Sequence, residues 1–155
     1  MAGRPGFRRV VLGMDGSPHA RRAAAFLERL QPPRGGRVTV VRVVEPVRVP
    51  SMPLVPGAMR AQIAGQAEAA NRTQVAAARR QVEAVAAGLA RAGWRARGVV
   101  RTAQPLAGLL ATVRAERADA LVLGARGAGA VTHFLLGSVA EAALKHAPVE
   151  VLIVK

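Results

Sequence analysis

The sequence predicts an α/β protein built on an open, mostly parallel five-stranded sheet with helices on both faces. Short runs rich in Val, Ile and Leu alternate along the chain with segments of helical periodicity, which is typical of such sheets. Apolar residues make up 51% of the 155 residues, enough to bury a core, and the length suits one domain, 1–155. Cysteine is absent, which excludes a disulfide scaffold and a thiolate metal site.

Each predicted strand except the last is followed by a helix. The first strand, 7–14, ends at Asp15-Gly16-Ser17-Pro18, where Ser17 is suited to cap the next helix and Pro18 to begin it. That helix stops at Gln31-Pro32-Pro33. The remaining strands are expected at 37–44, 95–101, 120–123 and 149–154.

The other connections are one irregular segment and three helices. Four prolines predict a flexible, irregular loop over 45–57. A long helix over 58–92 follows, with weak points at Gly65 and Gly88. Leucines at helical spacing predict a third helix around 106–113, and a fourth is expected over 138–146.

Strict alternation of strand and helix predicts a parallel sheet covered by helices on both faces. We expect the flavodoxin-like or Rossmann-like strand order 3-2-1-4-5. Ligands bind such sheets beyond the carboxyl ends of the strands, where the winding direction reverses. In this order the loops after strands one and four meet at that point. We therefore expect a ligand site there.

The loop after the fourth strand has the composition of an anion site. Gly124 and Gly127 leave room for a phosphate to approach the backbone, and Gly137-Ser138 open a helix whose free amides favour an anion. A purely structural alternative remains: Ser138 and Glu141 form an ordinary capping box, and the glycines serve the turn. No lysine follows the glycines as a P-loop requires, and His19, His133 and His146 are isolated in sequence.

At these residues the chain resembles a known family. The pattern Gly124-x2-Gly127-x9-Gly137-Ser138 resembles the nucleotide-binding signature of universal stress proteins, in the subgroup that binds ATP. The segment 10–17 looks like the family's first strand and Asp-Gly-Ser turn, 40–45 like its second strand, and 149–154 like its closing strand. The resemblance covers nearly the whole chain.

The resemblance implies a role for each matching residue. Gly13 and Asp15 would lie at the adenosine end, Val43 would offer its backbone amide and carbonyl to adenine, and Leu123 and Gly124 would line the ribose. The residues that would hold the phosphates are Gly127, Gly137, Ser138 and Val139. ATP is the implied ligand, and family members can carry a divalent ion, Mg²⁺ or Mn²⁺, on the phosphates.

Three positions depart from the family pattern. Ala140 stands where ATP-binding relatives often have another hydroxyl, so one phosphate hydrogen bond is lost, and Ala125 stands where they often have serine. Arg126 can compensate by pairing with a phosphate, or it can point into solvent.

The function that these features predict is a cytoplasmic, ATP-binding regulator or sensor of the stress response. We do not expect an enzyme, because hydrolysis needs a residue that orients water and the site offers Asp15 and little else; the resemblance implies at most slow hydrolysis or autophosphorylation. The alternatives are a non-nucleotide homodimeric interaction module of the same fold and a basic nucleic-acid-associated protein.

The charge bears on the nucleic-acid alternative. The chain has 23 Lys and Arg against 9 Asp and Glu, a net charge of +14, and only Lys145 and Lys155 are lysines. Such a surface attracts phosphate-rich partners. The arginines form no dense tract and aromatics are only 3%, so we interpret the charge as spread over exposed helix faces.

The last strand predicts an assembly. Val149 to Val154 would form the edge of the sheet, and an apolar edge is a pairing hazard if left open. A symmetric partner can cover it, and the family resemblance also implies a homodimer through this strand. The alternative is that Glu150 and Lys155 keep a monomer soluble. We expect no membrane association, since no stretch is long and apolar enough to span a bilayer.

Overall fold

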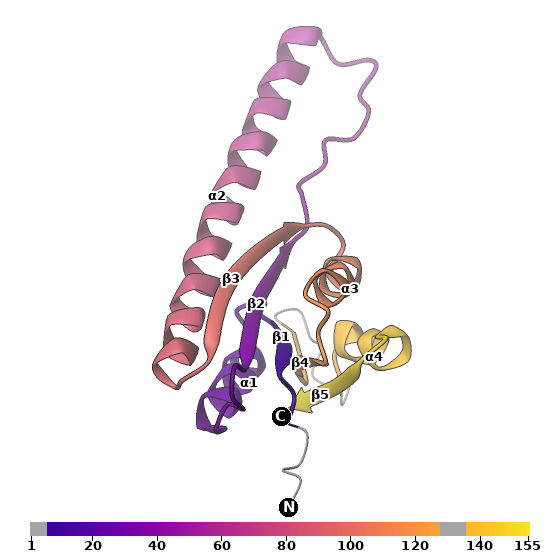
Figure 1. The fold of residues 1–155 in the computed structure, drawn as a ribbon. Coiled ribbons are helices and arrows are strands. Elements are labelled where there is room, and N and C mark those ends of the chain that lie inside the picture. Colours follow the sequence, from indigo (N-terminus) through magenta and orange to yellow (C-terminus); the bar gives the residue numbers. More distant parts are fainter. Residues whose placement is uncertain (1–5, 128–135) are drawn as a thin grey trace, which may run out of the picture.

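The fold is seen in a computed structural model, which describes residues 6–127 and 136–155. Strands and helices alternate from the first element to the last (Figure 1). The strands are β1 (Arg9–Gly13), β2 (Arg37–Val44), β3 (Arg95–Thr102), β4 (Ala120–Gly124) and β5 (Glu150–Val154). The helices are α1 (Pro18–Arg29), α2 (Gly57–Arg91), α3 (Pro105–Ala115) and α4 (Ser138–His146). These bounds confirm the predicted elements to within about two residues at most ends.

The five strands form one parallel sheet in the order β3-β2-β1-β4-β5, which confirms the predicted topology. The register matches Val11 with Thr39 on one side and with Leu121 on the other. β1 is the central strand and β4 lies beside it; both are almost wholly buried, which explains why their sequences are continuous apolar runs. β3 and β5 are the two edges.

Each face of the sheet has its own hydrophobic core. Helices α1 and α2 cover one face, where Leu12, Leu27 and Leu89 are fully buried (Figure 1). Helices α3 and α4 cover the other, around Val11, Leu121 and Val113. Alternation along the strands divides the side chains between the faces, so Val10 and Val11 belong to different cores.

Helix α2 is longer than the sheet it covers. Its 35 residues span about 52 Å, and Figure 1 shows its amino-terminal half rising well beyond the strands, beside the segment 45–56. Its buried residues all lie in the carboxyl-terminal half, from Ala78 to Leu89. Asn71 joins the helix to the segment, since its side chain accepts from the Val47 amide at 2.7 Å and donates to the Val47 carbonyl at 3.2 Å. The helix continues without a break through Gly65 and Gly88, the two predicted weak points.

Candidate functional site

A cavity of about 390 Å³ opens at the carboxyl end of the sheet, between the ends of β1, β2 and β4 and the start of α4. Its volume is in the range of small-molecule sites. All ten residues that the sequence singled out line it: Gly13, Asp15, Val43, Leu123, Gly124, Arg126, Gly127, Gly137, Ser138 and Val139. The fold therefore brings these segments, which are far apart in the sequence, to one place.

Ser17 joins the turn after β1 to the loop after β4. Its Oγ caps α1 by accepting from the Ala20 amide at 3.1 Å, as predicted, and donates to the Arg126 carbonyl at 3.1 Å. Asp15 shapes the same turn, because its Oδ1 accepts from the Ser17 amide at 2.9 Å. Ser17 is buried, so these bonds are shielded from water. The two loops that border the cavity are thereby fixed relative to each other.

Gly124 and Gly127 of the β4 loop differ in what surrounds the position of the absent Cβ. At Gly124 a Cβ would lie 2.5 Å from the His19 carbonyl carbon and 2.6 Å from the Ala20 nitrogen. Gly124 is thus required by the close approach of α1. Among the described residues a Cβ at Gly127 would meet only Asp15, with 2.9 Å to Oδ2, and the Gly127 backbone is not in the left-handed region. Gly127 therefore keeps the space beside Asp15 open.

The start of α4 closes onto the same loop. Gly137 donates from its amide to the Ala125 carbonyl at 2.8 Å, and a Cβ at Gly137 would lie 3.2 Å from the Gly127 nitrogen. Gly137, with extended backbone, is the N-cap of α4, and Ser138 is its first helical residue. The capping-box interpretation is therefore wrong: Ser138 is not the cap, and the Glu141 carboxylate instead accepts from Lys145 at 2.7 Å. The exposed Ser138 hydroxyl borders the cavity at the positive end of the helix dipole.

Val43 presents backbone groups to the cavity. β2 continues past β1, since the last register pair is Gly13 with Val41 and the last bond joins the Met14 amide to the Val41 carbonyl at 2.8 Å. Successive residues of a strand direct their N–H and C=O groups to opposite neighbours. The Val43 amide and carbonyl therefore point, like those of Val41, to the side where β1 has already ended. One donor and one acceptor lie side by side there.

Positive charge lies at the mouth of the cavity. Arg126 is partly exposed and lines it, while Arg22 extends from α1 nearby. Desolvation lowers the pKa of His19, and the charges of Arg22 and Arg126 lower it further, against an opposing effect of Asp15. His19 thus senses the charge at the phosphate end of the predicted site.

Several lining residues were missed by the sequence reasoning. They are Met14, Ala20, Val41, Glu45, Pro105 and Leu109, with Ala140 named only as a departure from the pattern. Met14 and Leu109 form apolar walls and read as ordinary core residues in the sequence. Glu45 adds a carboxylate at the end of β2, where its position directly after the strand is the one available signal.

His133, one of the histidines that are isolated in the sequence, lies outside the described residues. Within residues 6–127 and 136–155, no group of three His, Asp or Glu side chains is arranged to hold a metal ion. No helix of the described chain is long and apolar enough to cross a membrane.

Comparison with known proteins relates the chain to one family. The sequence model of the Universal stress protein family matches residues 6–155. A curated relative from Thermus aquaticus, the universal stress protein in the QAH/OAS sulfhydrylase 3' region, is 33% identical over 150 residues, covering 96% of this chain and 99% of its own.

Solved structures share the fold. The protein MJ0577 superposes with a TM-score of 0.79 at 18% identity, covering 96% of this chain and 95% of its own. A universal stress protein in complex with cAMP has a TM-score of 0.61 at 22% identity, with 96% and 97% covered. An Arabidopsis thaliana family protein with AMP bound has a TM-score of 0.58 at 17% identity, with 95% and 90% covered. The matched sequence family, the curated relative and the shared fold together show that this chain belongs to the universal stress protein family.

Proposed function

We propose that this protein binds an adenine nucleotide, specifically ATP, in the cavity at the carboxyl end of the sheet. In this proposal it acts as a nucleotide-dependent regulator of the stress response. The observation that carries the proposal is the convergence of all ten predicted residues on one cavity. The relatives with cAMP and AMP bound support an adenine nucleotide as the ligand class.

The adenine end of the proposed site uses main-chain groups. The Val43 amide and carbonyl form a donor–acceptor pair, which matches the adjacent acceptor and donor on the adenine edge. Guanine presents a different order of donors and acceptors on its corresponding edge. Leu109, Met14 and Leu123 supply apolar walls for the ring. We therefore expect ATP to bind more tightly than GTP.

The phosphate end uses the β4 loop and the start of α4. The amides of Gly127, Ser138 and Val139 lie around the space that the glycines leave open, and the dipole of α4 favours negative charge there. Arg126, at the mouth, supplies a guanidinium that suits a phosphate. A divalent ion, Mg²⁺ or Mn²⁺, would be held mainly by the phosphate oxygens, with Asp15 as the protein carboxylate beside it.

The direct test is to identify and count nucleotide in the purified protein. After denaturation, mass spectrometry should detect an adenine nucleotide, and nucleotide-free protein should bind ATP with one site per chain. GTP should bind at least tenfold more weakly. Nucleotide-free, folded protein that binds no adenine nucleotide would leave the interaction-module alternative as the better account.

We also propose that the protein forms a homodimer through β5. Among the described strands β5 pairs only with β4, and residues Val151–Val154 stay partly exposed in the single chain. The Val154 carbonyl accepts from Ala125 of the β4 loop, so by alternation the amides of Val151 and Ile153 point outward. These outward groups are free to pair with a second copy.

Because neighbouring amides of β5 point in opposite directions, proline substitutions at neighbouring positions should have different effects. Ile153→Pro removes an outward donor and should convert a dimer to a monomer in light scattering, because the lost donor would pair with the second copy. Leu152→Pro removes a donor that points to β4, so it should destabilise the fold instead. A wild type that is monomeric at tens of micromolar, or an Ile153→Pro variant that dimerises as tightly, would contradict the dimer.

A further inference from the structure

The amino end of the sheet, opposite the cavity, carries a row of arginines. β1, β2 and β3 each begin with one, and Arg9 pairs in register with Arg37, which pairs with Arg95. Adjacent strands lie about 4.8 Å apart, so the three Cα atoms form a row about 10 Å long. Residues in register point to the same face, here the face of Val11 and Val41, which α3 and α4 cover further along the strands.

Two more arginines join this row at a second hollow in the surface. Arg8 and Arg34, with Arg9 and Arg37, line a cavity of about 470 Å³, whose floor includes Gly35 and Asp119. The Arg8 guanidinium donates to the Arg34 carbonyl at 3.3 Å, which holds the two segments together. We call Arg8, Arg9, Arg34, Arg37 and Arg95 the amino-edge arginines.

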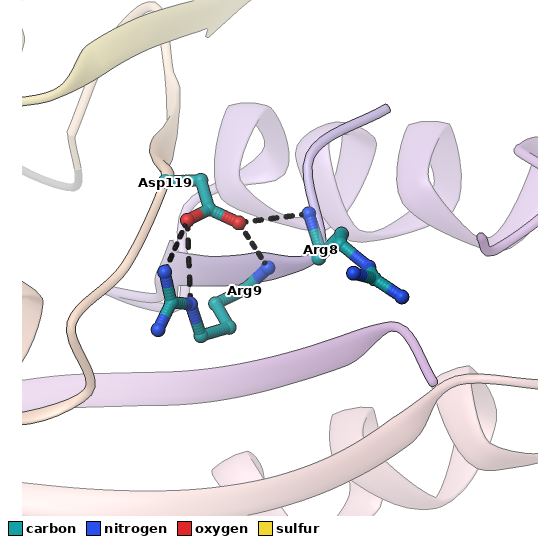
Figure 2. A network of polar contacts seen from close by, with 3 residues as sticks. All are labelled: Arg8, Arg9 and Asp119. Carbon is teal, nitrogen blue, oxygen red and sulfur yellow. Dashed lines mark hydrogen bonds and ion pairs between the residues drawn. The ribbon is translucent and has the colours of Figure 1, made fainter. Parts of the chain in front are cut away.

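The one carboxylate among the described residues of this hollow already has hydrogen-bond partners. Asp119 accepts from the amides of Arg8 and Arg9 at 2.9 Å each, and from the Arg9 guanidinium at 2.8 and 3.3 Å (Figure 2). It therefore fixes the start of β1 and neutralises Arg9. Within the described chain the guanidinium groups of Arg34, Arg37 and Arg95 make no hydrogen bond or ion pair, and all three residues are exposed. Arg34, Arg37 and Arg95 therefore remain unpaired in the described chain, whereas Asp119 is already bonded to Arg8 and Arg9.

Helix dipoles explain other cations at this end, but not these. The winding of the chain brings the carboxyl ends of the helices to the amino end of the sheet, and Arg29, Arg91 and Arg114 lie in last turns, where a cation stabilises the helix. The amino-edge arginines lie on strand starts and turns, which have no comparable dipole. Holding unpaired like charges together costs folding free energy, so an anionic partner would account for them.

One exposed aromatic side chain adjoins the arginines. Phe7 directly precedes Arg8 and is 37% exposed, although Phe is among the residues most often buried. Trp94, beside Arg95, is by contrast buried, and its Nε1 donates to the Leu27 carbonyl at 3.0 Å. Phe7 therefore offers an exposed ring directly beside Arg8 in the chain, just before the start of β1.

We propose that the amino edge is a binding site for single-stranded nucleic acid, separate from the nucleotide cavity. The guanidinium groups of Arg34, Arg37 and Arg95 contact successive backbone phosphates, since the planar fork matches phosphate oxygens. Phe7 stacks on one unpaired base. With stacking and phosphate contacts alone, binding is independent of base sequence. An acidic peptide or inorganic polyphosphate would use the arginines and leave the exposed ring without a role.

The test measures a fluorescently labelled 20-nucleotide RNA by anisotropy over a range of KCl concentrations. Arg34→Gln/Arg37→Gln/Arg95→Gln should weaken binding about ten- to a hundredfold near 0.1 M KCl and reduce the salt slope by about 2. The matched control, Arg60→Gln/Arg79→Gln/Arg80→Gln, removes three exposed α2 arginines and the same charge. It should weaken binding less than about threefold. An equal loss in the control would overturn the site, because binding would then follow net charge.

Two further arms separate the proposed ligand from other anions. Phe7→Ala should weaken RNA binding about tenfold with an unchanged salt slope, and should leave the binding of inorganic polyphosphate as it is. Polyglutamate or polyphosphate that binds as tightly as RNA, with no effect of Phe7→Ala, would overturn the nucleic-acid assignment. Gly127→Val should bind RNA like the wild type. Loss of RNA in that variant would instead place the RNA in the nucleotide cavity and also overturn the proposal.

Discussion

At the carboxyl end of the sheet glycines bring main-chain groups together, whereas at the amino end three neighbouring strands begin with arginine. The first end presents amides, a helix start and apolar walls to a small cavity. The second presents long charged side chains around an open hollow. The two ends of one parallel sheet thus present different chemistry: main-chain groups and apolar walls around a small cavity at one end, and charged side chains around an open hollow at the other.

The largest expected effect is on the backbone packing of the carboxyl end. Gly124→Ala should destabilise the fold by about 2–3 kcal/mol, because the new Cβ meets the backbone of α1 at His19 and Ala20, which cannot move alone. Urea unfolding measures this. In the control, Gly65→Ala lies in α2 with nothing within 4 Å and should stabilise by about 0.5–1 kcal/mol. A Gly124→Ala variant as stable as the wild type would show that α1 does not constrain Gly124.

The next effect concerns the bond that fixes the two cavity loops. Ser17→Ala removes the cap of α1 and the bond to the Arg126 carbonyl, and should cost about 1–2 kcal/mol in urea unfolding. ATP affinity should fall with it, since the β4 loop loses its anchor. Thr73→Ala, whose hydroxyl donates to the Ala69 carbonyl on exposed α2, serves as the control and should change stability by less than about 0.5 kcal/mol. A cap effect without a change in ATP affinity would mean that the loop holds its shape unaided.

At the amino end the corresponding fixed group is Asp119. Burial raises the pKa of its carboxyl, but hydrogen bonds from the Arg9 side chain and from the amides of Arg9 and Arg8 outweigh this, so the pKa lies below its ordinary value. A carboxyl whose pKa is lower in the folded than in the unfolded state stabilises the protein at pH values above its unfolded-state pKa. This stability is lost as the pH falls through the folded-state pKa.

The substitution Asp119→Asn should therefore cost about 1 kcal/mol at pH 7. The difference from wild type should stay constant down to about pH 5 and shrink below about pH 4. Unfolding experiments over this pH range measure it. A difference that grows on acidification would contradict the assignment of Asp119 as the ionised anchor.

The smallest effect is a titration shift at the cavity mouth. The pKa of His19 is lowered by desolvation and by Arg22 and Arg126. It should rise in Arg126→Gln and also when ATP adds negative charge nearby, with AMP having less effect. Titration of the His19 ring by NMR measures both changes. The same shift with AMP and ATP would indicate that the phosphate chain does not reach His19.

Local patterns in the sequence were sufficient to predict the elements, and the strand order followed from the fold class that their alternation indicates. Prolines and Asp15-Gly16-Ser17 mark ends that the structure confirms, and Val-rich runs mark buried strands. These are properties of neighbouring residues, so no knowledge of distant contacts is needed.

Other features that depend on distant contacts were not predictable. The requirement for Gly124 comes from α1, more than a hundred residues away in the chain, and the bond from Ser17 to Arg126 spans the same separation. The arginines looked scattered in the sequence, and only the register of three strands shows that Arg9, Arg37 and Arg95 adjoin. The capping box at Ser138 failed because Gly137, with its extended backbone, begins the helix instead.

The most direct test of the account is calorimetric titration of ATP into nucleotide-free wild type and Gly127→Val. Gly127 has an ordinary backbone conformation, and a side chain there meets Asp15 in the space proposed for the phosphates. Wild type should bind one ATP per chain, as should the control Gly65→Ala. Gly127→Val should remain folded by circular dichroism and bind ATP at least a hundredfold more weakly. A folded Gly127→Val variant with wild-type ATP affinity would contradict the assignment of the carboxyl-end cavity.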